Sequence, residues 1–484
     1  MIVQGTSMRE QDSQILLETA ELLIEYLSEN DNADIPMSEY LNANDLSKRL
    51  NLSLSEQGVP HEYIVDDIKQ YLRYSTRTGH PHFMKQLYSG STSAAIAGDW
   101  VTTATNTAAH TYQVSPVATL MEQALIRQLN SLVGFEDGDG IMVTGGSNAN
   151  LVGIYCGLHK RWPEIKQQGF RGQQPVIYVS DQCHYSYEKA VFTLGIGTDN
   201  LRKIATDDQG AMNPLALREA IEVDLAQGKH PYCIGATSGT TVAGAFDPLE
   251  PLADIAEKYK LWLHVDAAWG GPVLFSDTHK QLMKGVARAD SVSWDAHKFM
   301  ALPLICSAIL VREKGILESA CSGGGSTYLF HEDENSEYNA GSKSLQCGRR
   351  VDSLKLWLDW RHKGTQGYRQ QLDESMQLAQ DFRAKIEAHE QLELILQPSY
   401  LNVFFRFVKH ENQDSQARDQ LNLKILTRMK ESGRFYIDYS TVKNEFGIRL
   451  VLANNRIKAS HLNSLLAEIV RIGNEIQSSY DLIS

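Results

Sequence analysis

The sequence predicts an α/β fold with a mostly parallel central sheet, helices on both faces of that sheet, and a small C-terminal α+β domain. From about residue 120, short apolar runs alternate with longer amphipathic segments. This alternation requires crossover connections, which place parallel strands side by side under a cover of helices. Toward the C-terminus the pattern changes to strand-like segments that are typical of a smaller antiparallel sheet.

The strands expected in the central sheet are short, apolar runs. They are IMVT (141–144), VIYVS (176–180), CIGAT (233–237), LWLHVDAA (261–268), SVSW (291–294) and AILV (308–311). Helical periodicity predicts helices over residues 13–28, 215–226, 251–259 and 461–472. The C-terminal strands are expected at residues 399–407 and 446–454.

Composition limits the partners that the protein can have. The formal net charge of −13 is spread along the 484 residues, which disfavours binding to nucleic acid or anionic membranes. The six scattered cysteines form no metal-binding pattern, so we expect no metal site, and free thiols are typical of the cytoplasm. No apolar run approaches the length of a membrane span, and the first residues lack a signal-peptide pattern. We therefore expect a cytoplasmic protein that acts on a small molecule.

Lys298 directly follows an expected strand, in the string SWDAHK (293–298). A single lysine is usually a solvated surface charge, but this one has companions that suit pyridoxal 5'-phosphate (PLP). That cofactor needs an amine for its aldehyde, an anion beside its pyridine nitrogen, a flat group on its ring face, and backbone donors for its phosphate. Lys298 is the candidate amine.

The other three requirements also have candidates at strand ends. Asp266 ends an apolar run, where an unpaired carboxylate would be costly, and is the candidate partner of the pyridine nitrogen. His184 is the candidate stacking imidazole, and Ala268 is small enough to lie against the other ring face. The glycine turn TGGSN (144–148) opens a helix and is the candidate phosphate site, with the hydroxyl-rich turn SGTT (238–241) beside it.

Longer strings make the chain similar to a known family. They are TGHP (78–81), QL (86–87), NT (106–107), TY (111–112), GIGTD (195–199), TTVAGAFDP (240–248), HVDAAWG (264–270) and LQCGR (345–349). From about residue 70 to the C-terminus the chain resembles the group II PLP-dependent decarboxylases, within them the glutamate and cysteine sulfinate decarboxylase branch. The resemblance implies fold type I of the PLP-dependent transferases, the aspartate aminotransferase-like fold, and a carboxy-lyase activity.

The resemblance also implies a role for individual residues. The catalytic residues would be Lys298 as the Schiff-base lysine, His184 as the ring-stacking histidine and Tyr328 as the proton donor on a mobile loop. The cofactor-binding set would be Gly146, Ser147, His184, Thr240, Asp266, Ala268, His297 and Lys298, with Gly348 and Arg349 brought by a partner subunit. Substrate would be bound by Gln86, Ala108, His110 and Arg449, the last holding the carboxylate that is not lost.

Three positions depart from the family pattern. Ala108 and His110 stand where the glutamate branch has larger or polar and aromatic residues, and these positions are expected to line the side-chain pocket. Asp295 replaces an asparagine that is common near the phosphate in animal members. An acid there would repel a phosphate dianion unless it is paired or turned away.

Decarboxylation of a small acidic L-amino acid is the expected reaction, with glutamate, which gives GABA, as the first choice of substrate. Aspartate and cysteine sulfinate are alternatives. Arg449 and the segment around Gln86 disfavour 2,4-diaminobutyrate and aromatic amino acids. A non-enzymatic homologue that acts as a binding partner is a further alternative, which the presence of Lys298, Asp266 and His184 disfavours.

We expect three segments in the chain. Residues 1–110 would be a helical segment that forms a homodimer, residues 111–365 the large PLP-binding domain, and residues 366–484 the small C-terminal domain. The apolar stripe of the first helix has no obvious domain of its own to pack against, which favours the dimer.

Overall fold

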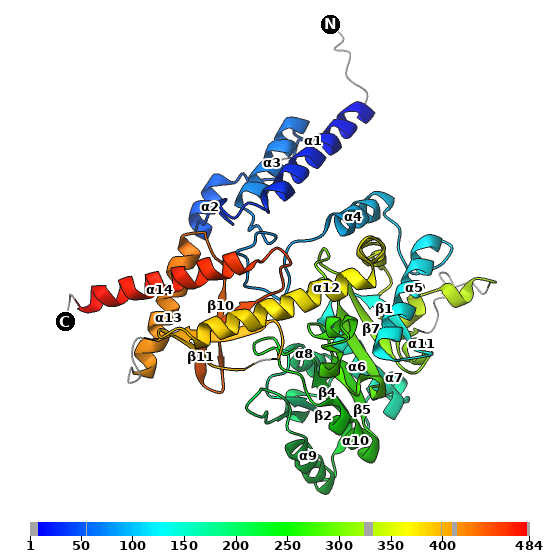
Figure 1. The fold of residues 1–484 in the computed structure, drawn as a ribbon. Coiled ribbons are helices and arrows are strands. Elements are labelled where there is room, and N and C mark those ends of the chain that lie inside the picture. The colour runs from blue at the N-terminus through cyan, green and yellow to red at the C-terminus, as the bar shows by residue number, and fades with distance from the viewer. Residues whose placement is uncertain (1–7, 55, 324–332, 398, 409–413, 482–484) are drawn as a thin grey trace. The chain divides into compact units, whose positions relative to one another are not determined.

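The computed structural model describes residues 8–54, 56–323, 333–397, 399–408 and 414–481 (Figure 1). The chain groups into two compact units, each of which is described by itself. Unit 1 contains residues 1–90, 386–393 and 405–484, and unit 2 contains residues 91–385 and 394–404.

Unit 2 is built on a seven-stranded sheet of order β1-β7-β6-β5-β4-β2-β3. Its strands are β1 (Asp139–Val143), β2 (Pro175–Ser180), β3 (Leu201–Ile204), β4 (His230–Thr237), β5 (Trp262–Asp266), β6 (Ser291–Asp295) and β7 (Ser307–Val311). From β3 through β6 all neighbours pair in parallel, whereas β7 runs antiparallel to both β6 and β1. The mostly parallel sheet is therefore confirmed, and the sequence missed only β3 among these strands.

Helices cover both faces of this sheet. They are α4 (Ser93–Thr105), α5 (Pro116–Val133), α6 (Gly146–Arg161), α7 (Ile165–Gln168), α8 (Ser186–Thr193), α9 (Pro214–Ala226), α10 (Leu249–Tyr259), α11 (Ile316–Cys321) and α12 (Ser353–Glu387). Helix α6 packs with α8 over one face, where it contacts β4 to β7, and α9 packs with α10 over the other. On that second face, Tyr178 of β2 donates a hydrogen bond to Asp224 of α9 across 3.0 Å.

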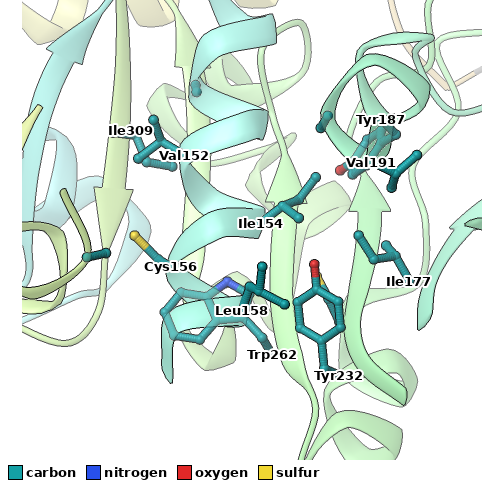
Figure 2. Close-up of a cluster of buried hydrophobic side chains, with 14 of the residues drawn as sticks. Val152, Ile154, Cys156, Leu158, Ile177, Tyr187, Val191, Tyr232, Trp262 and Ile309 are labelled. Atoms are coloured by element: carbon teal, nitrogen blue, oxygen red, sulfur yellow. The ribbon is translucent and has the colours of Figure 1, made fainter. Parts of the chain in front are cut away.

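The core beneath α6 is a cluster of buried apolar side chains (Figure 2). Ile154 and Leu158 of α6 point toward Ile177 of β2 and Tyr232 of β4, and all four side chains are almost completely buried. Each fully buried side chain of this size contributes about 1.5–3 kcal/mol to folding. This packing fixes the position of α6 over the strands, and therefore the position of its first turn.

Unit 1 joins the two ends of the chain. Its helices are α1 (Met8–Glu29), α2 (Ala43–Arg49), α3 (His61–Tyr74), α13 (Ser415–Glu431) and α14 (Ala459–Asp481). A four-stranded sheet has the order β10-β11-β9-β8, with β8 (Leu392–Leu394), β9 (Asn402–Phe407), β10 (Asp438–Val442) and β11 (Glu445–Val451). No helix within the described ranges is long and apolar enough to cross a membrane.

The units differ from the three segments expected from the sequence. The N-terminal residues join the C-terminal ones because the Met84 amide binds the Tyr436 carbonyl at 2.8 Å and the Met84 carbonyl accepts from Val451 at 3.1 Å. Residues 91–110 belong to unit 2 instead, where the Thr92 amide donates to the Ala301 carbonyl at 3.1 Å. Most of α12 also stays in unit 2.

His82 is a buried histidine in unit 1, where residues near 83 pair with residues near 436. The ring of His82 stacks on Phe435 with 4.1 Å between centroids, and its Nδ1 lies 3.0 Å from the Arg434 carbonyl. Burial lowers the pKa of His82 to about 4, and the neighbouring His80 and His461 add to this effect. Because the unfolded chain protonates His82 near its ordinary pKa of about 6.5, the folded state loses stability as the pH falls from about 6.5 toward 4.

We predict that His82→Gln, which keeps a side-chain donor for the Arg434 carbonyl, makes unfolding less sensitive to acid. The wild-type protein should lose roughly 3 kcal/mol of stability between pH 6.5 and 4 through this one group. Urea unfolding midpoints measured across that range test it, with His362→Gln at an exposed histidine as the control. Equal pH slopes for wild type and His82→Gln would contradict the assignment.

Candidate active site

Lys298 follows β6 at the carboxyl edge of the parallel strands. Its Nζ lies 3.1 Å from Oδ2 of Asp295, and about a fifth of its side chain is exposed. The residues before it, from Ala296 to His297, are buried and hold the turn in place. The amine is therefore held inside the protein but remains accessible to a small molecule.

Asp295 is a buried carboxylate that is paired on both oxygens. Oδ1 accepts a hydrogen bond from Ser307 at 2.6 Å, and Oδ2 also lies 3.7 Å from Nε2 of His297. Burial by itself would raise the pKa of Asp295, but the charges of Lys298 and His297 outweigh it and hold the pKa below its ordinary value. A fixed negative charge thus lies beside the candidate amine.

Asp266 ends β5, next to β6, where its register partner is Ser293. Its Oδ1 accepts from the Ala268 amide at 3.1 Å and from the Ser293 hydroxyl at 3.2 Å. Its Oδ2 accepts from the Asn150 amide nitrogen at 2.7 Å. The two oxygens of this buried carboxylate thus accept hydrogen bonds from three donors.

His184 is close enough to Asp266 and Lys298 for both charges to act on its ring. Its Nδ1 accepts a hydrogen bond from the Ser186 amide at 3.2 Å, so its proton is on Nε2 when the ring is neutral. Burial lowers the pKa of His184, while Asp266 opposes this shift and Lys298 adds to it. The structure therefore brings His184, Asp266 and Lys298 within electrostatic range of one another.

Some backbone amides in the first turn of α6 have no acceptor within the helix. The amides of Asn148 and Ala149 bind the Gly145 carbonyl at 2.9 and 3.0 Å, which leaves the amides of Gly146 and Ser147 without a helical acceptor. Ser147 is exposed. A Cβ atom on Gly146 would lie only 2.6 Å from Oδ2 of Asp295, so glycine is required there. This turn is a candidate anion site, near Asp295 and therefore near the lysine that pairs with Asp295.

Other expected cofactor residues are also in unit 2. Thr240 is buried and its Oγ1 accepts the Ala245 amide at 3.0 Å. Nδ1 of His297 lies 3.1 Å from the Cys306 carbonyl. Ala268 contributes the amide that binds Asp266, and its side chain is small and buried.

Gly348 and Arg349 differ in their burial. The Arg349 guanidinium is enclosed within its own chain, where it binds Glu122, the Ala109 carbonyl and, at 3.0 Å, the Met142 carbonyl. Gly348 is exposed, with open space around it. The part of this segment that a partner subunit could present is thus the backbone at Gly348, and the Arg349 side chain instead stabilises its own unit.

The expected substrate residues are divided between the units. Ala108 and His110 are partly buried in unit 2, and Nδ1 of His110 is a buried nitrogen with no protein partner in the described part of the chain. Gln86 and Arg449 belong to unit 1, where Nη2 of Arg449 donates to the Lys85 carbonyl at 2.6 Å and lies 3.3 Å from Asp438. Tyr328 lies outside the described residues.

Sequence reasoning missed two residues that matter to the site geometry. Asn150 binds Asp266, and Ser307 binds Asp295. The sequence contains a signal for Asn150, because this residue follows Gly146 by one helical turn and is therefore on the same face of α6. Ser307 opens an apolar antiparallel strand and had none.

A lysine, a buried carboxylate and an imidazole at the edge of a parallel sheet, beside a glycine-opened helix, define a PLP-dependent enzyme of fold type I. A family model described as the pyridoxal-dependent decarboxylase conserved domain matches residues 43–408, and the chain belongs to this family. The cofactor is therefore PLP and the enzyme is a carboxy-lyase.

Individual relatives agree with this assignment. The chain is 40% identical over 465 residues to cysteine sulfinic acid decarboxylase from Rattus norvegicus, covering 93% of this chain and 94% of the relative. It is 35% identical to an acidic amino acid decarboxylase from Xenopus tropicalis, covering 90% and 88%. The crystal structure of mouse CSAD superposes with a TM-score of 0.93 at 35% identity, covering 97% of this chain and 99% of that one.

The residues of unit 2 fit the cofactor. The lysine amine suits its aldehyde, the ionised Asp266 suits a protonated pyridine nitrogen, and the free amides of the α6 turn suit its phosphate. Asp295 is the one group whose charge opposes the phosphate, and Lys298 offsets that charge across 3.1 Å.

We predict that Asp295→Asn binds PLP more tightly, because a phosphate bound at the first turn of α6 would no longer face a fixed negative charge. The dissociation constant should fall by about three- to tenfold. Titrating PLP-depleted protein and following visible absorbance measures it, with the exposed Asp277→Asn as the control. Weaker binding by Asp295→Asn would show instead that its pairing with Lys298 is the dominant effect.

Proposed function

We propose that the chain decarboxylates a small acidic L-amino acid, with cysteine sulfinate as the first candidate. The observation that carries this proposal is the 40% identity, over 93% of the chain, to cysteine sulfinic acid decarboxylase of Rattus norvegicus. The sequence had favoured glutamate, and the curated relatives move the first choice to cysteine sulfinate. Glutamate and aspartate remain the next candidates, which is consistent with the Xenopus tropicalis relative, an acidic amino acid decarboxylase.

The protein's own groups divide the work of the proposed reaction. PLP, when bound, supplies an aldehyde for amines and a ring that accepts electrons. Lys298 would hold the cofactor aldehyde through Nζ. Asp266 would pair with the ring nitrogen of the cofactor, and His184 would lie against the ring. Tyr328, outside the described residues, remains the predicted donor of a proton to Cα.

Arg449 is proposed to bind the acidic side chain of the substrate. Arg449 would hold the acid group that is retained, which orients the α-carboxylate for loss. Burial lowers the pKa of Arg449 and Asp438 opposes this shift. His110, whose buried Nδ1 has no protein partner among the described residues, stands where the glutamate branch has an aromatic residue.

Release of carbon dioxide from cysteine sulfinate, aspartate, glutamate and 2,4-diaminobutyrate at equal concentration tests the proposal. We predict that cysteine sulfinate gives the highest kcat/KM and that the diamino acid gives the lowest. Lys298→Ala, measured in parallel, should release none, since substrate then has no route to the cofactor. A preference for 2,4-diaminobutyrate over all three acids would overturn the substrate class.

We predict that Arg449→Ala lowers kcat/KM on the best acidic substrate. The expected loss of transition-state binding is about 2–5 kcal/mol, the usual cost of losing a buried charge contact. Arg428→Ala, at a half-exposed arginine whose nearest carboxylate is 3.8 Å away, is the matched control in unit 1. Unchanged kcat/KM for Arg449→Ala would assign the specificity to another residue.

We also propose that the enzyme is a homodimer. Unit 2 exposes a group of large apolar side chains near α4 and α5: Trp100, Val101, Val114, Val117 and Leu120, each between 42% and 63% exposed. Large exposed apolar side chains are enriched at protein interfaces when they lie together, which supports this proposal. Sedimentation velocity should give a single dimeric species at micromolar concentration, and a catalytically active monomer would contradict this prediction.

A further inference from the structure

A continuous chain of hydrogen bonds runs through buried side chains from Trp262 to Asp266. Nε1 of Trp262 lies 2.9 Å from Oγ of Ser291, which lies 2.8 Å from Nδ1 of His264. Nε2 of His264 lies 3.0 Å from Oδ1 of Asn150, whose Nδ2 lies 2.7 Å from Oδ2 of Asp266. The proposed active site uses only the last of these groups.

The chemistry at the two ends gives this chain one direction. An indole nitrogen only donates, and an ionised carboxylate only accepts. Because Nδ2 of Asn150 donates to Asp266, the group that it presents to His264 is Oδ1, which only accepts. The imidazole proton is therefore on Nε2, Nδ1 accepts from Ser291, and Ser291 accepts from Trp262.

The packing of α6 leaves room for the side chains of this hydrogen-bond chain. A Cβ atom on Gly153 would lie 2.4 Å from Nδ1 of His264, and one on Gly157 would lie 2.7 Å from the Trp262 ring. Trp262 and His264 alternate along β5 and face α6, where Figure 2 shows Trp262 close to Leu158. Two glycines four residues apart thus admit both rings beneath the helix.

Burial makes each link of the chain costly to break. Asn150 and His264 are 1% and 0% exposed, and Ser291 is also fully buried. Burial lowers the pKa of His264 to about 4, which keeps the imidazole neutral at working pH. The second Nδ2 proton of Asn150 reaches Oγ of Ser186 at 2.9 Å, beside the amide that binds His184.

We propose that Asn150 is a positioning residue that holds the Asp266 carboxylate toward the cofactor ring, with its own amide oriented by His264, Ser291 and Trp262. This inference rests on the proposed role of Asp266 as the partner of the pyridine nitrogen. Asn150 acts by donating a proton in a hydrogen bond, and a group that cannot donate cannot replace it.

Asn150→Asp turns this requirement into a pH dependence. The new carboxyl group keeps the size of the amide and faces His264 on one side and Asp266 on the other. Two carboxyl groups about 2.7 Å apart cannot both ionise easily, so one pKa is strongly raised. While protonated, the new group donates to Asp266 as the amide did, and at higher pH it loses its proton and repels Asp266.

The test compares the holoenzymes of wild type, Asn150→Asp, Asn150→Leu and Asn130→Asp. Asn130 is a matched control, because it is a buried asparagine on α5 whose Nδ2 binds only the Asp139 carbonyl, at 3.2 Å. The readouts are the rate of PLP release on dilution, followed by visible absorbance, and the pH profile of kcat.

We expect Asn150→Asp to release PLP within about threefold of the wild-type rate at pH 6 and at least tenfold faster at pH 8.5, with kcat falling over the same range. Asn150→Leu should release PLP rapidly at both pH values, and Asn130→Asp should follow the wild type. A flat, wild-type profile for Asn150→Asp overturns the proposal. The proposal is also overturned if both Asn150 variants release PLP equally fast at every pH, because the side chain would then only fill space. A wild-type protein that binds no PLP would instead refute the proposed role of Asp266.

Discussion

The buried carboxylate of Asp266 is the constraint on which the rest of the structure depends. A charge at the end of a central parallel strand is tolerated only when donors surround it, and Asp266 has three, from Asn150, Ala268 and Ser293. Those donors come from α6, from the turn after β5 and from β6. The carboxylate therefore links α6, the turn after β5 and β6 by hydrogen bonds.

The same arrangement produces the site. Parallel strands bring their carboxyl ends to one edge of the sheet, so Asp266 and Lys298 lie at the same edge although 32 positions separate them in the sequence. The apolar face of α6 packs on the strands, and its glycines let the helix approach closely enough for Asn150 to reach Asp266. Asp295 then balances the lysine across 3.1 Å.

The strands, the lysine and the carboxylate could be predicted because each leaves a local signal: an apolar run followed by a polar residue. Strand β3 was missed because it is a four-residue edge strand whose central Arg202 and Lys203 give no apolar run. The grouping of residues 1–90 with the C-terminus depends on pairing between Met84 and Tyr436, which no local pattern reveals. Arg349 could not be assigned to Glu122, 227 positions away, for the same reason.

The central claim is that an ionised Asp266 keeps the pyridine nitrogen of bound PLP protonated. Reconstitution with PLP labelled with ¹⁵N in its ring, followed by the ¹⁵N chemical shift, tests it most directly. We predict a protonated nitrogen in the wild-type enzyme throughout the pH range in which it stays folded, and an unprotonated nitrogen in Asp266→Asn. An unprotonated nitrogen in the wild-type holoenzyme at neutral pH would contradict the account.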